Sequence, residues 1–77
     1  MNDQLQRYTV LRLNGAGDLI VLGEVQGEDD EAALLEASDL VRDSLDGSLL
    51  DRDDQVTVQR ADGTPICDAT EAEDFVR

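Results

Sequence analysis

The hydrophobic and polar positions of the chain change their period along its length, and this change predicts the order of its elements. Residues 8–13 are rich in β-forming side chains and predict a strand. Residues 14–17 (Asn-Gly-Ala-Gly) favour a chain reversal, because Asn and Gly accept positive φ angles. Residues 19–25 then predict a second strand, which pairs back on the first as a hairpin.

From about residue 29 to residue 46 the apolar period becomes close to 3.6, which predicts an amphipathic helix. Asp29 or Asp30 is expected to cap its first turn, where carboxylates also suit the positive end of the helix dipole. Gly47 is expected to end the helix as a left-handed cap. The apolar side of this helix comprises Ala33, Leu34, Ala37, Val41 and Leu45, with Leu40 alongside.

The C-terminal third returns to a period of two. Residues 55–60 alternate polar and apolar side chains and predict a half-buried strand. After a turn at 61–63, residues 64–67 are expected to form a short fourth strand at a sheet edge, because Pro65 has no amide donor. A last helical turn is expected from Thr70, since Thr70 and Glu73 have the spacing of a capping box.

The predicted fold is therefore α+β, with the order ββαββ: an antiparallel four-stranded sheet with one helix packed on one face. It forms one domain over residues 1–77, with looser tails at 1–7 and 70–77. Both faces of the first hairpin carry apolar residues, whereas one helix covers only one face. The second face needs the tail (with Phe75 and Val76), another copy of the chain or a partner to cover it. Tail packing and a homodimer stay open as equal alternatives, with Leu11, Leu13, Ile20 and Leu22 as the residues expected at this face.

Charge changes the picture most. Nineteen carboxylates stand against six arginines, with no histidine, so the formal net charge is −13. Self-repulsion at this density destabilises a compact state. The charge therefore serves either solubility and high-salt adaptation or a partner with a basic surface. Direct nucleic-acid binding is disfavoured, because it requires a basic face.

The residue types argue against catalysis. Without histidine, the commonest general base and the usual metal ligand are missing. Gly15-Ala16-Gly17 precedes a strand rather than a helix, so it predicts a hairpin turn and not a phosphate-binding loop. Asp51, Asp53 and Asp54 fail the calcium-loop pattern, because its sixth and twelfth positions hold Val56 and Asp62. No enzyme activity, cofactor or metal is expected.

Two short features have simple interpretations. Asp43-Ser44-Leu45-Asp46 resembles the modified-serine site of acyl carrier proteins, but Ser44 falls near the end of a helix that strands flank. Cys67 is the single cysteine, which excludes an internal disulfide and suits a small buried hydrophobe. The polar N-terminus and the short apolar run at 19–22 predict a cytoplasmic protein that does not contact the membrane.

The acidic surface carries the main functional hypothesis. Glu36, Asp39, Asp43 and Asp46 recur at intervals of three, four and three residues, which stacks them along one helix face about 5–6 Å apart. Rows of carboxylates at this spacing can imitate a phosphate backbone and occupy a basic groove made for DNA or RNA. The residues expected to bind such a partner are Asp29, Asp30, Glu31, Glu36, Asp39, Asp43, Asp46, Asp51, Asp53 and Asp54.

In size, charge and element order the chain resembles small acidic phage-encoded inhibitors, notably anti-CRISPR proteins that act as DNA mimics. The resemblance runs from the first hairpin through residues 28–35 (Glu-Asp-Asp-Glu-Ala-Ala-Leu-Leu) to residues 56–58 and 61–63. It implies binding to a CRISPR effector complex, at the Lys- and Arg-rich site that receives target DNA, in the host cytoplasm. The alternative is a structural or regulatory interaction module, a monomer or a homodimer, that binds through the apolar second face of the sheet.

Overall fold

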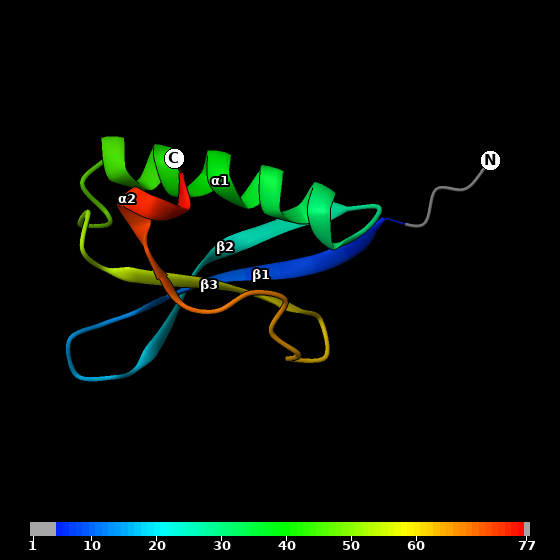
Figure 1. The fold of residues 1–77 in the computed structure, drawn as a ribbon, viewed down its shortest axis with the longest axis horizontal. Coiled ribbons are helices and arrows are strands. Elements are labelled where there is room, and N and C mark those ends of the chain that lie inside the picture. The colour runs from blue at the N-terminus through cyan, green and yellow to red at the C-terminus, as the bar shows by residue number, and fades with distance from the viewer. Residues whose placement is uncertain (1–4, 77) are drawn as a thin grey trace.

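The computed structural model describes residues 5–76, over which the chain forms four strands and two helices (Figure 1). The elements are β1 (Gln6–Leu13), β2 (Leu19–Gly27), α1 (Asp30–Asp46), β3 (Gln55–Arg60), β4 (Thr70–Glu71) and α2 (Ala72–Phe75). The strands form one antiparallel sheet in the order β2-β1-β3-β4. The predicted α+β fold with a helix packed on the sheet is confirmed.

Both helices lie on the same side of the sheet (Figure 1). The sheet approaches α1 closely at β2, where a Cβ added to Gly23 would lie 3.0 Å from the Leu40 Cδ2 atom. The short α2 contacts both α1 and β3. Between these layers the core is aliphatic apart from one tyrosine, and its fully buried or nearly buried residues are Tyr8, Val10, Ala33, Ala37, Val41, Leu50, Val56, Val58 and Ala72.

The start of α1 follows the sequence prediction. Asp29 is the N-cap, in extended conformation, and its Oδ1 accepts a hydrogen bond of 2.8 Å from the Ala32 amide. This bond satisfies one of the amides that have no partner within the first turn of a helix. Asp30 and Glu31 follow in the first turn, where their charges face the positive end of the helix dipole.

The end of α1 corrects the prediction for Gly47. Gly47 has a φ of −84°, whereas the left-handed residue is Ser48, with a φ of 61°. The Leu49 amide donates to the Ser44 carbonyl (2.9 Å) and the Ser48 amide to the Leu45 carbonyl (3.2 Å). These bonds form a Schellman motif with Ser48 at the position that glycine usually occupies. The helix ends at Asp46 as expected, but the left-handed residue comes one position later than predicted.

The fourth strand is also corrected. Residues 64–67 return along β3, but they form a single bridge between Gln59 and Pro65, and the paired strand is Thr70–Glu71. The physical reason is that Pro65 cannot donate to the ladder, so pairing is interrupted and resumes further along the chain. The predicted capping box does not form, because Glu71 is the N-cap of α2 and Thr70 donates its hydroxyl to the Asp68 carbonyl (3.1 Å).

The C-terminal segment is packed, but not where the second sheet face would need it. Ala72 is fully buried, while Phe75 and Val76 pack against the main core on the helix side. The alternative in which the tail covers the second face is therefore wrong. Residues 6 and 7 are paired in β1, whereas residues 1–4 and 77 lie outside the described part of the chain.

The middle of the second face is closed by the connection between β3 and β4. Thr57 and Leu11 are direct partners in the β1–β3 register and are 8% and 7% exposed. The Thr57 hydroxyl donates to the Cys67 carbonyl (3.1 Å), so the backbone at Cys67 lies against this face. The same segment crosses β3 in Figure 1, drawn in orange. Cover for this part of the sheet thus comes from within the chain.

Ser48→Gly is expected to raise the free energy of unfolding by about 0.5–1 kcal/mol, because a non-glycine residue strains the left-handed conformation. Urea unfolding of both proteins under one buffer condition measures the difference. Ser48→Ala is the control, since it removes the hydroxyl while keeping the Cβ, and it should not stabilise the protein. Equal stability of all three proteins would contradict the argument.

Candidate protein-binding surface

The outer face of α1 presents the row of carboxylates that the sequence predicts. Glu36, Asp39, Asp43 and Asp46 are all exposed. The buried side of the helix is formed by Ala33, Ala37, Val41 and Ser44, so the two sides are clearly separated. Because the apolar side is held against the sheet, the carboxylate row has a fixed orientation relative to the fold.

Arg42 lies within this row and neutralises part of it. Its Nη1 lies 3.4 Å from the Asp39 Oδ1 atom, and its Nη2 donates to the Val76 carbonyl at 3.1 Å. The ion pair is exposed, which makes its contribution to stability small. The second bond links α1 to the C-terminal segment, so Arg42 serves the fold as well as the charge balance.

Two of the residues predicted to bind a partner are used by the fold instead. Asp29 caps α1, as described above. Asp30 accepts hydrogen bonds from the Tyr8 hydroxyl (2.9 Å) and from Arg60 Nη2 (2.7 Å), and so joins α1 to β1 and β3. The Arg60 hydrogen bond, with that of Tyr8, lowers the pKa of Asp30 below its usual value. Burial of the ring, followed by the Asp30 contact, raises the pKa of Tyr8.

Asp51, Asp53 and Asp54 form a second cluster, in the loop before β3. One oxygen of each lies within 4.8 Å of the others, a spacing that could in principle serve a cation. However, Asp54 Oδ2 lies 3.4 Å from Arg12 Nη1 and accepts the Asp51 amide at 3.0 Å. The arginine already supplies positive charge here, so we interpret Asp54 as an anchor for the loop. Asp51 and Asp53 are exposed and remain candidates for partner binding.

The structure adds a residue that the sequence analysis missed. Glu24 of β2 and Glu36 of α1 line one shallow hollow of about 580 Å³, together with Leu5, Val25 and Gln26. The acidic surface therefore continues from the helix onto the outer edge of the sheet. Only the packing of α1 on β2 brings these two residues to one hollow, and the sequence signal available was the exposed position of Glu24 in the strand.

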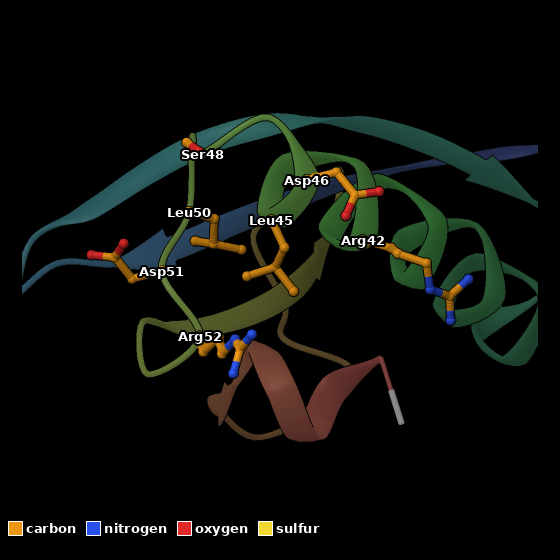
Figure 2. A pocket seen from close by; sticks show the side chains of 7 residues that line it. All are labelled: Arg42, Leu45, Asp46, Ser48, Leu50, Asp51 and Arg52. Carbon is orange, nitrogen blue, oxygen red and sulfur yellow. The ribbon is translucent and has the colours of Figure 1, made fainter.

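At the other end of α1 the surface changes character. Figure 2 shows a hollow of about 400 Å³ lined by two arginines, two aspartates and three further residues, namely Arg42, Arg52, Asp46, Asp51, Leu45, Ser48 and Leu50. Arg42 comes from the helix and Arg52 from the following loop, while the Asp51 side chain points away from both. The mixed charge makes this end less suited to a basic partner than the Glu24–Glu36 end.

The serine of the carrier-like motif is closed to modification. Ser44 is 5% exposed, and its hydroxyl donates to the Leu40 carbonyl at 2.9 Å. A prosthetic group attached there would have to displace the core.

Cys67 is a free thiol of intermediate exposure that packs against the main core, as a small hydrophobe does. Neither α1 nor α2 has the length and hydrophobicity that a membrane-spanning helix needs.

The four apolar residues predicted at the second face do not share a face. Leu11 and Leu13 pair with Val21 and Leu19, on the side away from the helices. Ile20 pairs with Arg12, which also pairs with the core residue Val56, so Ile20 lies on the helix side. Leu22 packs against the main core. The register shifts between Val10 and Leu11 because β2 contains one extra residue there, Leu22. This β-bulge and the register at the turn cause the difference from the prediction.

No protein-family model, curated protein or solved structure matches the chain. Its function is therefore argued from the geometry and charge of its own residues.

Asp30→Asn is expected to destabilise the protein above about pH 4, the ordinary range of an aspartate, and to have less effect as the pH falls. The pKa of Asp30 is lowered in the folded state, so its contribution is present above the unfolded pKa and is lost as the pH falls through the folded value. Urea unfolding of both proteins across pH 2–7 measures this. Arg60→Gln should raise the pKa of Asp30, which NMR titration reports, and a difference between wild type and Asp30→Asn that does not change with pH would contradict the assignment.

Proposed function

We propose that the protein is a non-enzymatic inhibitor that binds the basic, nucleic-acid-binding surface of another protein, with its acidic helix face in the place of a phosphate backbone. The observation that carries this proposal is the exposed row of Glu36, Asp39, Asp43 and Asp46 on α1. Glu24 lines a hollow with Glu36 at the sheet edge, and Glu31 is exposed in the first turn of the same helix. In this proposal Asp29, Asp30 and Asp54 hold the scaffold, and the exposed carboxylates contact the partner.

The spacing of the row suits this role. Ten residues separate Glu36 from Asp46, which is about 15 Å of helix axis at 1.5 Å per residue. The four carboxylates therefore fall about 5 Å apart along the axis, against one phosphate per about 3.4 Å along a DNA strand. The charge density is somewhat lower than that of DNA, but it is of the same order and the same sign.

The arginines support the same conclusion. Among the described residues, Arg12, Arg42 and Arg60 each form an ion pair with an aspartate of the same chain. These pairs offset the charges of Asp54, Asp39 and Asp30 and leave Glu36, Asp43 and Asp46 of the row to set the potential. A surface of this kind attracts a basic partner over long range, speeds association and makes binding sensitive to salt.

The resemblance to phage-encoded anti-CRISPR proteins narrows the class of partner. Under this proposal the partner is a CRISPR effector complex in the host cytoplasm, and the protein blocks the channel that receives target DNA.

The first experiment is capture of partners from host extract on the tagged full chain, with elution by stepped salt and identification by mass spectrometry. A nucleic-acid-binding complex that is released at moderate salt and displaced by DNA would support mimicry. A captured partner that resists both salt and DNA would contradict it.

The double reversal Asp39→Lys and Asp43→Lys is expected to weaken partner binding at least about 100-fold, because like charges would then face each other across the interface. Titration calorimetry against the captured partner measures the affinity. The control is the reversal of Asp18 and Asp68, two exposed aspartates outside α1. Each reversal adds two units to the formal charge of −13, so both double variants carry about −9. Equal loss of affinity in the two variants would show that net charge alone acts, and would contradict a specific helix surface.

A further inference from the structure

The edge strand β2 carries an exposed apolar segment without charged residues. β2 is one edge of the sheet. Leu19, Ile20 and Val21 are 51%, 39% and 60% exposed. Residues 19–23 carry no charge, although 32% of the whole chain is charged, and Asp18 and Glu24 flank this segment. An exposed apolar edge strand is the kind of segment that pairs with another strand.

The register shows which backbone groups of this segment are open. The Asn14 amide donates to the Asp18 carbonyl at 3.0 Å, so these two residues form a hydrogen-bonded pair at the end of the hairpin. Hydrogen-bonded and non-hydrogen-bonded pairs alternate in an antiparallel ladder. The Leu13–Leu19 pair is then non-hydrogen-bonded and the Arg12–Ile20 pair is hydrogen-bonded. The amides and carbonyls of Leu19 and Val21 therefore point outward, away from β1.

The opposite side of the sheet supports this alternation. The same alternation of hydrogen-bonded and non-hydrogen-bonded pairs continues from β1 into β3. It predicts that the backbone amides and carbonyls of Val58 and Arg60 point away from β1. The Ile66 amide does donate to the Val58 carbonyl (2.9 Å), and the Arg60 amide donates to the Thr64 carbonyl (2.8 Å). The assignment of outward groups in β2 thus agrees with hydrogen bonds on the far edge.

We propose that β2 pairs antiparallel with β2 of a second copy of the chain, across a two-fold axis at Ile20. Leu19 of each copy then lies opposite Val21 of the other, so the outward amides and carbonyls of both residues meet as two hydrogen-bonded pairs. Ile20 lies opposite its own counterpart. The two sheets join into one continuous sheet, an isologous interface in which the same segment serves both copies.

The distribution of charge along β2 favours a second copy of the chain as its pairing partner, and it also determines the register of the pairing. A basic partner finds no carboxylate within residues 19–23, whereas a second copy presents an apolar strand of the same kind. An axis at Val21 would place Asp18 opposite Glu24, and like charges directly opposite each other destabilise a strand pair. An axis at Ile20 places Asp18 opposite Leu22 and avoids this contact. The bulge at Leu22 and Gly23 limits the pairing to a short segment.

This interface is weak and has the opposite salt dependence to the acidic surface. A pairing of so few residues buries less than the roughly 1,200 Å² of a stable complex, so the dimer forms only at high protein concentration. Each copy carries a net charge of −13, and salt screens the resulting repulsion. High salt therefore favours the dimer, whereas it weakens binding to a basic partner, so either proposal can fail without the other.

Sedimentation equilibrium of the full chain, from micromolar to about millimolar concentration in 0.1 M and about 1 M NaCl, tests the proposal. The average mass is expected to rise from 8.4 kDa toward twice that value, and to rise further at the higher salt concentration. Val21→Pro should weaken the dimer at least about 10-fold, because it removes an outward amide that makes no bond within the monomer. Val21→Glu keeps the amide and should weaken the dimer by charge repulsion. Leu35→Glu is the control and should leave the dimer unchanged, since Leu35 is 67% exposed on α1, outside β2.

Amide exchange followed by NMR supplies a residue-level test of the register. The Leu19 and Val21 amides should exchange freely in dilute solution and gain at least about 10-fold protection as the dimer forms. The Ile20 amide, bonded to β1, should be protected at all concentrations. A constant mass of 8.4 kDa under all conditions would overturn the proposal. A dimer in which Leu19 and Val21 still exchange freely, or one that tolerates both Val21 variants, would overturn it as well.

Discussion

The packing of one helix face against the sheet is the interaction on which the rest of this structure depends. The helix contributes Ala33, Ala37 and Val41, which are fully buried, to the same core as Val10 and Val58 of the sheet. Gly23 of β2 lets the helix approach this strand closely, because an added Cβ there would lie 3.0 Å from the Leu40 Cδ2 atom. Because this face is apolar, Glu36, Asp39, Asp43 and Asp46 lie on the outer side of α1. Asp30, in the first turn, instead binds Tyr8 and Arg60 of the sheet.

A chain of net charge −13 has to limit its self-repulsion, and it does so with few cations. Arg60 joins β3 to the start of α1 through Asp30, and Arg12 joins β1 to the loop before β3 through Asp54. Each arginine thus stabilises a tertiary contact while it neutralises one carboxylate. Among residues 5–76, the carboxylates outside these pairs are exposed, and a basic surface would relieve their mutual repulsion. The scaffold and the proposed function therefore have a common electrostatic origin.

The two proposed binding surfaces differ in their exposed side chains, since one is acidic and the other is apolar. The acidic surface follows α1 and reaches the sheet edge at Glu24, whereas the apolar segment 19–23 lies next to it along β2. Charge attraction acts at long range and decreases with salt, while strand pairing needs contact and tolerates salt. Partner binding and self-association would thus respond to solution conditions in opposite directions, although they use adjacent parts of one strand.

Most of the element order follows from local patterns, which is why the sequence predicted it. The hairpin, α1 with its cap at Asp29, and β3 depend on periodicity and on turn or cap chemistry within a few residues. The exposed row on α1 was predictable for the same reason, since helix geometry alone places residues 36, 39, 43 and 46 on one side. The predictions that failed concern a helix end, an edge strand and the cover of the second sheet face.

By itself, the sequence determined the α+β class, the amphipathic helix and the charge of its outer face, because each depends on contacts that are close along the chain. Only the tertiary structure decided that Asp30 and Asp54 bind arginines of the sheet. The partners in these two ion pairs are separated by 30 and by 42 positions along the chain. It also decided the placement of Leu11, Leu13, Ile20 and Leu22, because one bulged residue and the strand register select the face of every side chain. Long-range pairing is a property of the packed chain as a whole, and no local pattern in the sequence specifies it.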